Sequence, residues 1–352
     1  MKTILKTTMS AAAALLVLPI LSFSGEGKSI YGSDNRLEYF AASQDMKTLS
    51  DSVVSFWKAP LVEMAGGSAK LKTQNFGDAL NLCPGERFRE QPVGAFCSGS
   101  LVGEDIVMTA GHCIKDDAGC ANARIAFGYA IKKDGEAAVT TLPASEVYSC
   151  AKILKRFRGG EPGSANPAGQ NLGADYALIQ LDRKVSGHRP LAINRGVDLK
   201  NGDSISVIGY PVGLPLKVAG GASVRDFSKI GYFVTDLDTF GGNSGSPVFN
   251  TRTGKIEGIL VRGAEDFADS PAGCTIMATY DQNGGRGEDV TKISALMPFI
   301  SKQGFLDRLL ILMSIKQDQI TLEGSKAIEM RDVDTSAIQP ISPAPAPDVN
   351  FY

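Results

Sequence analysis

The chain has 352 residues, of which 43% are apolar and 21% are charged, and its formal net charge is −2. These values suit a soluble globular protein of one large domain or two smaller ones, and they exclude the basic character of a nucleic-acid or membrane-surface binder. Thirty-nine glycines and seventeen prolines favour turns and short strands over long helices. Any histidine-dependent chemistry must use His112 or His188, the only two histidines.

Residues 1–24 have the pattern of a secretory signal peptide. Lys2 and Lys6 precede an apolar run over residues 11–21, and small residues follow it. The run is shorter than the ~20 residues of a membrane span, although a retained anchor is the alternative. We therefore expect a secreted or periplasmic protein that has no membrane association after signal cleavage.

The six cysteines would then lie in a compartment that permits disulfides. Six cysteines allow fifteen complete pairings, and the sequence alone does not select one. No pair has C-x-x-C spacing, and histidines are few, so we expect neither a metal site nor a cofactor.

Residues 25–75 are interpreted as a pro-segment removed from a zymogen, or as an extension packed on the main domain. About fifty residues make only a marginal core, which argues against an independent domain. Residues 30–35 resemble a strand running into a turn, and the β-branched and aromatic run at 53–57 is typical of a strand in a sheet.

From residue 76 onward, short apolar runs alternate with turn residues. Residues 95–109 predict a β-hairpin with a turn at 103–105, and further strands are expected at 124–130, 147–154, 176–181, 205–209, 230–235, 255–261 and 275–280. Helical periodicity occurs only at 290–300 and 305–315. This pattern predicts an all-β barrel or sandwich over residues 76–302, with a C-terminal helix and a Pro-rich tail within 303–352.

Ser244 is the candidate nucleophile. It lies in the sequence GGNSGSPVF, and flanking glycines allow unusual backbone conformations and close approach of a substrate chain. A serine presented in this way leaves nearby backbone N–H groups free for a developing oxyanion. An ordinary turn between two strands is the alternative when this stretch is considered alone.

His112 is the candidate base, and Asp175 is the residue expected to orient it. His112 ends a predicted strand in TAGHC, where a neutral imidazole can accept a serine proton. Cys97, on the preceding strand, is the candidate disulfide partner of Cys113. Asp175 directly precedes the apolar run of DYALIQL, and a buried carboxylate there needs a partner such as an imidazole N–H. His188 lies in a polar turn and is expected at the surface.

These motifs carry a family resemblance. The order His112, Asp175, Ser244, with TAGHC, DYALIQL and GGNSGSPVF around them, resembles the chymotrypsin-like serine peptidases. It is most similar to the bacterial branch that includes glutamyl endopeptidases of the staphylococcal V8 type. FCSGSLV paired with TAGHC is similar to the histidine-loop disulfide of animal trypsins, here Cys97–Cys113. The resemblance covers about residues 76–300.

The resemblance implies two packed six-stranded β-barrels with the catalytic triad His112, Asp175 and Ser244 at their interface. The backbone N–H groups of Gly242 and Ser244 would form the oxyanion hole. Substrate contacts would come from Asp238, Thr239 and Gly263. Polypeptides are the implied substrates, and the chain is expected to act as a monomer without cofactor or metal.

Two departures from the family pattern affect activation and specificity. Asn243 stands where trypsin-type zymogens have an aspartate, so that activation switch is not expected. The chain reads Gly258-Ile259-Leu260 where glutamyl endopeptidases are expected to have a histidine after Gly-Ile. Asp238, six residues before Ser244, matches the acid at the base of the trypsin pocket and favours cleavage after Lys or Arg.

Several alternatives stay open at this stage. Asp238 can also be a turn residue that points to solvent, and Arg262 can pair with it. The rival functions are a peptidase specific for acidic or small residues, and a latent or inactive protease-like binding module.

Overall fold

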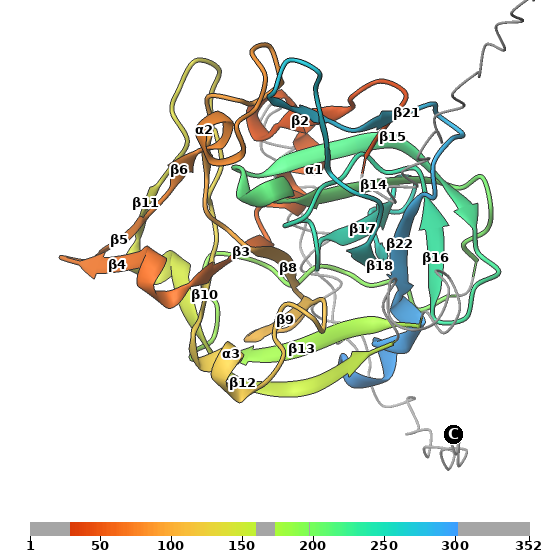
Figure 1. The fold of residues 1–352 in the computed structure, drawn as a ribbon. Helices are drawn as coiled ribbons and strands as arrows, with labels where there is room; N and C mark the ends of the chain where they lie inside the picture. Colours follow the sequence, from red (N-terminus) through yellow and green to blue (C-terminus); the bar gives the residue numbers. More distant parts are fainter. Residues whose placement is uncertain (1–28, 160–172, 197, 302–352) are drawn as a thin grey trace, which may run out of the picture. The chain divides into compact units, whose positions relative to one another are not determined.

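The fold is known from a computed structural model that describes residues 29–159, 173–196 and 198–301 (Figure 1). Within these residues nearly all regular structure is β, and the helices are short, the longest having seven residues. The all-β prediction is therefore confirmed. The signal peptide at residues 1–24, the segment 305–315 and the Pro-rich tail lie outside the described residues.

The first barrel is a closed ring of six antiparallel strands in the order β10-β12-β13-β9-β8-β3. The predicted hairpin supplies two of them, because residues 103–105 form the turn between β8 and β9 (Figure 1). The strands of this barrel are β3 (Val53–Lys58), β8 (Cys97–Leu101), β9 (Ile106–Thr109), β10 (Ala123–Ala126), β12 (Val147–Arg158) and β13 (Asp175–Leu181).

β3 changes the domain boundary predicted at residue 76. It lies in the range assigned to a pro-segment or extension, yet it pairs with both β8 and β10 and closes the ring. Five of its six residues are buried. Residues from β3 onward are therefore part of the barrel, since removing this strand would leave the barrel open along two edges.

The second barrel also contains six strands. They follow the order β14-β17-β18-β22-β16-β15, and the pairing of β14 with β15 closes the ring, while β2 adds to the outer edge of β15. The strands are β14 (Ser204–Gly209), β15 (Lys217–Asp226), β16 (Tyr232–Thr235), β17 (Pro247–Asn250), β18 (Ile256–Arg262), β22 (Glu288–Lys292) and the edge strand β2 (Arg36–Glu38). The double-barrel prediction is confirmed.

The remaining elements are short. The small sheets contain β1 (Ile30–Tyr31) with β21 (Thr279–Tyr280), β4 (Val62–Ala65) with β5 (Ser68–Leu71) and β11 (Thr141–Pro143), β6 (Gln74–Asn75) with β7 (Pro92–Val93), and β19 (Phe267–Asp269) with β20 (Thr275–Met277). The α-helices are α1 (Gln44–Ser50), α2 (Phe76–Leu80) and α3 (Asp117–Ala121), and the 3₁₀ turns are η1 (Tyr39–Ala41), η2 (Ala59–Leu61), η3 (Ala144–Glu146), η4 (Pro211–Gly213), η5 (Ile293–Ala295) and η6 (Met297–Phe299).

The helix predicted over residues 290–300 is wrong. This stretch begins as barrel strand β22 and continues as the 3₁₀ turns η5 and η6. Val290, Ile293, Leu296 and Ile300 are all buried and recur at three- and four-residue spacing. A strand followed by tight turns produces the same apolar spacing as one face of a helix, so local periodicity does not separate the two. No helix among the described residues is long and apolar enough to cross a membrane.

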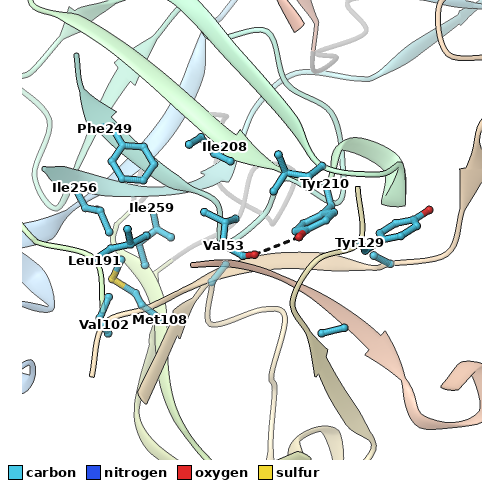
Figure 2. Close-up of a cluster of buried hydrophobic side chains, with 14 of the residues drawn as sticks. Val53, Val102, Met108, Tyr129, Leu191, Ile208, Tyr210, Phe249, Ile256 and Ile259 are labelled. Atoms are coloured by element: carbon cyan, nitrogen blue, oxygen red, sulfur yellow. Dashed lines mark hydrogen bonds between the residues drawn. The ribbon is translucent and has the colours of Figure 1, made fainter. Parts of the chain in front are cut away.

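A continuous apolar core joins the two barrels (Figure 2). Val53 and Met108 contribute from the first barrel, and Phe249 and Ile259 contribute from the second. The Tyr210 hydroxyl donates to the Val53 carbonyl at 3.2 Å within this core. Burial of this shared surface holds the barrels together, and the serine and histidine segments lie where they meet.

Candidate active site

His112 and Asp175 face each other across adjacent strands of the first barrel. β13 pairs with β9 so that Ala177 lies opposite Thr109. Continuing this antiparallel register brings Asp175 beside Gly111, the residue before the histidine. A Cβ atom at Gly111 would lie 2.7 Å from Asp175 Oδ1. The absence of a side chain at Gly111 therefore lets the carboxylate approach the histidine.

Two hydrogen bonds join this pair. Asp175 Oδ2 lies 2.7 Å from His112 Nδ1, and the backbone N–H of His112 donates to Oδ1 at 3.2 Å. Asp175 is only 2% exposed, whereas the His112 side chain is 26% exposed. Because a carboxylate only accepts, the bond assigns the proton of a neutral imidazole to Nδ1. His112 Nε2 is then an acceptor on the solvent side, which is the state that a general base requires.

Ser244 lies in a tight turn that only glycine neighbours permit. Gly242 and Gly245 have φ values of +83° and +91°, which belong to the left-handed region favoured by glycine. A Cβ atom at Gly242 would lie 2.5 Å from the Tyr210 carbonyl oxygen, and one at Gly245 would lie 2.1 Å from the Ser98 carbonyl oxygen. Gly245 therefore lets the serine turn pack directly against β8 of the first barrel, and Gly242 lets it pack against the segment that follows β14.

Polar contacts attach this turn to β8 and to the histidine loop. The Ser98 N–H donates to the Ser244 carbonyl at 2.9 Å, and the Ser98 hydroxyl donates to the Gly242 carbonyl at 2.7 Å. Cys113 Sγ lies 3.6 Å from the Ser244 carbonyl oxygen. Within the described residues no hydrogen bond joins Ser244 Oγ to His112 Nε2. Such bonds are often long before a substrate binds.

The backbone amides of the serine turn divide into two groups. In the first group, the Asn243 N–H donates to the Phe240 carbonyl at 3.0 Å, and the Gly245 N–H donates to the Leu260 carbonyl at 2.7 Å. The Ser246 N–H donates to the Asn243 carbonyl at 2.8 Å. The N–H groups of Gly242 and Ser244 donate to no acceptor in the part of the chain that the structure describes. These are the two amides predicted for the oxyanion hole, and two such donors can stabilise a tetrahedral oxyanion.

The predicted disulfide Cys97–Cys113 is present and connects β8 to the residue after His112. Two further disulfides, Cys83–Cys274 and Cys120–Cys150, complete the pairing. The sulfur atoms of Cys97 and Cys113 lie close to the His112 ring. Because both are in a disulfide, neither offers the thiolate that a metal ion would need.

Asp238 was predicted to contact the substrate, but in the structure it contacts the N-terminal segment that contains Tyr31 and Asn35. Its Oδ1 accepts from the Tyr31 N–H and its Oδ2 from the Asn35 N–H, both at 2.8 Å. The residue is 3% exposed, and burial raises its pKa to about 6 although the two N–H donors oppose this shift. Asp238 therefore does not point to solvent as a turn residue, and both of its oxygens are bonded within the protein.

Thr239 and Gly263 lie together, and a residue that sequence reasoning missed lies between them. Thr239 Oγ1 donates to Glu288 Oε2 at 2.7 Å. A Cβ atom at Gly263 would lie 1.9 to 2.3 Å from the carboxyl group of Glu288. Glu288 is completely buried at the start of β22. The available sequence signal was weak, because the acidic pair Glu288-Asp289 precedes the mixed stretch Val-Thr-Lys rather than an apolar run.

Two further side chains have partners other than those considered from the sequence. Arg262 does not pair with Asp238, because its Nε lies 3.2 Å from Asp289 Oδ2. His188 is partly buried in a loop: its ring stacks on Phe127 and its Nε2 lies 2.7 Å from Glu146 Oε2. His188 thus packs against the first barrel, and His112 is the histidine of the candidate site.

Comparison with known proteins locates a family domain over the same region. Residues 97–259 match the family model of the trypsin-like peptidase domain. This range contains His112, Asp175 and Ser244, whereas Gly263 and Glu288 lie beyond its end.

The chain is also similar to characterised bacterial proteins. It is 28% identical over 161 residues to a glutamyl endopeptidase of Bacillus licheniformis, covering 44% of this chain and 45% of that protein. It is 27% identical over 169 residues to a glutamyl endopeptidase of Staphylococcus aureus, covering 46% of this chain and 42% of that protein. The chain thus matches less than half the length of these relatives.

Two solved structures are similar to this one in fold at low sequence identity. The Vibrio cholerae VesB protease gives a TM-score of 0.44 at 16% identity, covering 76% of this chain and 66% of that one. A Glu endopeptidase gives a TM-score of 0.41 at 18% identity, covering 77% and 97%. Over residues 97–259 the chain therefore matches the trypsin-like peptidase domain, and its motifs resemble those of the chymotrypsin-like serine peptidases.

Proposed function

We propose that this protein is a serine endopeptidase that hydrolyses peptide bonds through an acyl-enzyme intermediate. The observation that carries the proposal is the 2.7 Å contact between His112 Nδ1 and Asp175 Oδ2. It lies beside a serine turn in which two backbone N–H groups donate to no acceptor among the described residues. This contact holds the imidazole with Nε2 as an acceptor.

In the proposed mechanism, Ser244 Oγ attacks the carbonyl carbon of the scissile peptide bond while His112 Nε2 takes the hydroxyl proton. The carbonyl oxygen becomes an oxyanion that accepts from the Gly242 and Ser244 amides. His112 then protonates the leaving amine, the C–N bond breaks and the acyl-enzyme remains. Water repeats the sequence with His112 as base, which releases the carboxylic acid product and restores the serine hydroxyl.

A serine-directed phosphonate reagent tests this proposal. We expect covalent labelling of Ser244, detected as a single mass shift on the peptide that contains it, and hydrolysis of a denatured protein substrate. The Ser244→Ala and His112→Ala variants should neither be labelled nor hydrolyse the substrate. A folded wild-type protein that resists labelling would overturn the proposal in favour of a latent or inactive protease-like binding module.

We propose cleavage after Lys or Arg as the specificity, against the alternatives of acidic or small residues. Support comes from Leu260 at the position where a glutamate-binding histidine is expected, and from the acidic residues Asp238 and Glu288 near the site. The two bacterial relatives are glutamyl endopeptidases, so cleavage after Glu is the competing outcome. Peptides that differ only in the residue before the scissile bond decide between them.

We further propose that the protein acts outside the cytoplasm, either secreted or periplasmic, as a monomer without membrane association after signal cleavage. Three disulfides support an oxidising compartment. N-terminal sequencing of protein recovered from the culture medium and from periplasmic extract tests the location and the maturation site together. Recovery only in the cytoplasmic or membrane fraction would reject this part of the proposal.

A further inference from the structure

The carboxylate of Glu288 lies between the two backbone segments that border the serine turn. One segment leads into that turn through Thr239, and the other continues β18 through Gly263. Gly245 and Leu260 hold the two segments together, because the Gly245 N–H donates to the Leu260 carbonyl at 2.7 Å. These two segments flank Ser244, so the side chain of the substrate residue before the scissile bond would lie next to them and next to the space that Glu288 occupies.

Gly263 and Thr239 give Glu288 its position in the gap. The carboxyl group occupies the space that any side chain at Gly263 would fill, with contacts of 1.9 to 2.3 Å to a Cβ there. Thr239 Oγ1 donates to Oε2 at 2.7 Å and fixes that side of the carboxylate. Gly263 is half-exposed, so a substrate group that passes over it meets Glu288 next.

The other oxygen of Glu288 has longer contacts. Oε1 lies 3.3 Å from the Tyr31 hydroxyl and 3.5 Å from the Ala264 N–H, near the limit for hydrogen bonds. A cationic group can replace such contacts with a charge-assisted bond, which is shorter and about twice as strong. Oε1 is therefore the side of the carboxylate on which a substrate cation can be bound.

A second acidic residue lies beside the serine turn, since Asp266 Oδ2 accepts from the Gly241 N–H at 2.7 Å. The arginines of this region have other contacts. Arg262 and Arg286 are directed to Asp289, and Arg225 lies over the Tyr31 ring. Burial, followed by the negative charge of Glu288, raises the pKa of the Tyr31 phenol. A carboxylate on the substrate would meet like charge in a poorly solvated site, which is costly.

We infer that Glu288, rather than Asp238, is the residue that recognises a Lys or Arg side chain on the residue before the scissile bond. The inference rests on the proposed endopeptidase function and names its substrate class. It separates this chain in specificity from its glutamyl endopeptidase relatives, because a buried anion at the pocket favours a cation and rejects glutamate.

Peptides that are identical except for Lys, Arg, Gln or Glu before the scissile bond test the inference. We expect kcat/KM of the wild-type protein to be at least roughly 100-fold higher for Lys and Arg than for Glu, the size expected for a buried charge pair. Glu288→Gln should lower kcat/KM for Lys and Arg by roughly 100-fold and change that for Gln only a few-fold. Preference for Glu, or basic preference that survives Glu288→Gln, overturns the inference.

Glu257→Gln is the matched control. Glu257 is also a buried glutamate of the second barrel, 4% exposed, and it accepts from Asn194 Nδ2 at 3.0 and 2.9 Å. Its neutralisation should leave the ratio of Lys to Gln cleavage unchanged. An equal loss of this ratio in both variants would mean that Glu288 acts only through stability, and would also overturn the inference.

Benzamidine binding to the Ser244→Ala protein gives a readout that needs no turnover. We expect Glu288→Gln in this background to weaken benzamidine binding by roughly 100-fold, while the uncharged benzyl alcohol binds both proteins equally. Equal benzamidine affinity in the two proteins contradicts the inference. Failure of phosphonate labelling in the wild type would instead reject the proposed function, so the two failures are distinguishable.

Discussion

At the scale of single residues, the site depends on positions where a Cβ atom has no room. Gly111 lets Asp175 approach the His112 backbone, and Gly245 lets the serine turn lie against Ser98. At both positions a Cβ atom would come too close to its neighbour, so only glycine allows the contact. The glycines in TAGHC and GGNSGSPVF are therefore as much a part of the geometry as His112 and Ser244, which they flank.

Asp175→Asn should lower kcat by about 10⁴-fold with little change in KM. An asparagine amide can donate to His112 Nδ1, which moves the imidazole proton to Nε2 and removes the base. Steady-state kinetics on a peptide substrate measure the effect. Asp182→Asn, an exposed aspartate just beyond the other end of β13, is the control and should retain activity. Near-normal kcat for Asp175→Asn would contradict the role given to this carboxylate.

Asp238 should make stability depend on pH. Its folded-state pKa is raised from 3.8 to about 6, mainly by burial, so the folded protein holds this proton where the unfolded chain has released it. The contribution of Asp238 is therefore most favourable below about pH 4 and is lost as pH rises through about 6. The loss amounts to at most about 3 kcal/mol.

Urea unfolding at pH 4 and pH 7.5 measures this effect, with Ser244→Ala as the background to prevent self-cleavage. The free energy of unfolding of the Asp238→Asn variant should rise relative to its parent between the two pH values. Asp134→Asn, which changes an exposed aspartate, corrects for the general loss of a carboxylate. If the free energy of unfolding of the variant instead fell relative to its parent as the pH is raised, the raised pKa given to Asp238 would be contradicted.

At the scale of elements, the short segments around the site are attached by few but long-range connections. β1 pairs in parallel with β21, and the disulfide Cys83–Cys274 spans 191 residues of sequence. The disulfide Cys120–Cys150 spans only 30 residues, between α3 and β12. Closing a longer loop removes more conformational freedom from the unfolded chain.

Removing the long-range disulfide should therefore cost more stability than removing the short one. On the chain-entropy model, the Cys83→Ser/Cys274→Ser variant should lose about 1 to 2 kcal/mol more than the Cys120→Ser/Cys150→Ser variant. Urea midpoints and slopes of the two variants provide the comparison. An equal or reversed order would show that packing strain, rather than loop length, determines the loss.

At the scale of the whole molecule, residues 53–58 join the first barrel although they precede all of the recognisable motifs. β3 closes the ring between β8 and β10, and Val53 also accepts the Tyr210 hydroxyl bond at the core between the barrels. The folded unit therefore begins well before residue 76.

A chain that starts at residue 76 should fail to fold, whereas a chain that starts at residue 29 should retain the barrel and the site. Loss of β3 exposes two strand edges and the apolar surface that it buries. Far- and near-ultraviolet circular dichroism and phosphonate labelling distinguish the two. A labelled, cooperatively unfolding protein that lacks residues 29–75 would contradict the assignment of β3 to the barrel.

The sequence by itself determined the all-β class, the hairpin before His112, and the residues that carry the proposed chemistry. These depend on local signals, namely alternating apolar runs, turn glycines and three short motifs in a set order. The strand at residues 53–57 was likewise recognisable from its composition, as was the strand running into a turn at 30–35, where β1 covers Ile30–Tyr31. The apolar spacing of residues 290–300 was ambiguous, because a buried strand with tight turns repeats like a helix.

Only the tertiary structure decided which distant groups meet. Asp238 and Glu288 are both buried acids, and nothing in the neighbouring sequence distinguishes the one that accepts from backbone amides from the one that lies against Gly263. The difference arises because the N-terminal segment folds back onto Asp238, 207 residues away from Tyr31. Burial and hydrogen-bond partners are properties of such long-range contacts, so the specificity of the site is decided by packing rather than by any single motif.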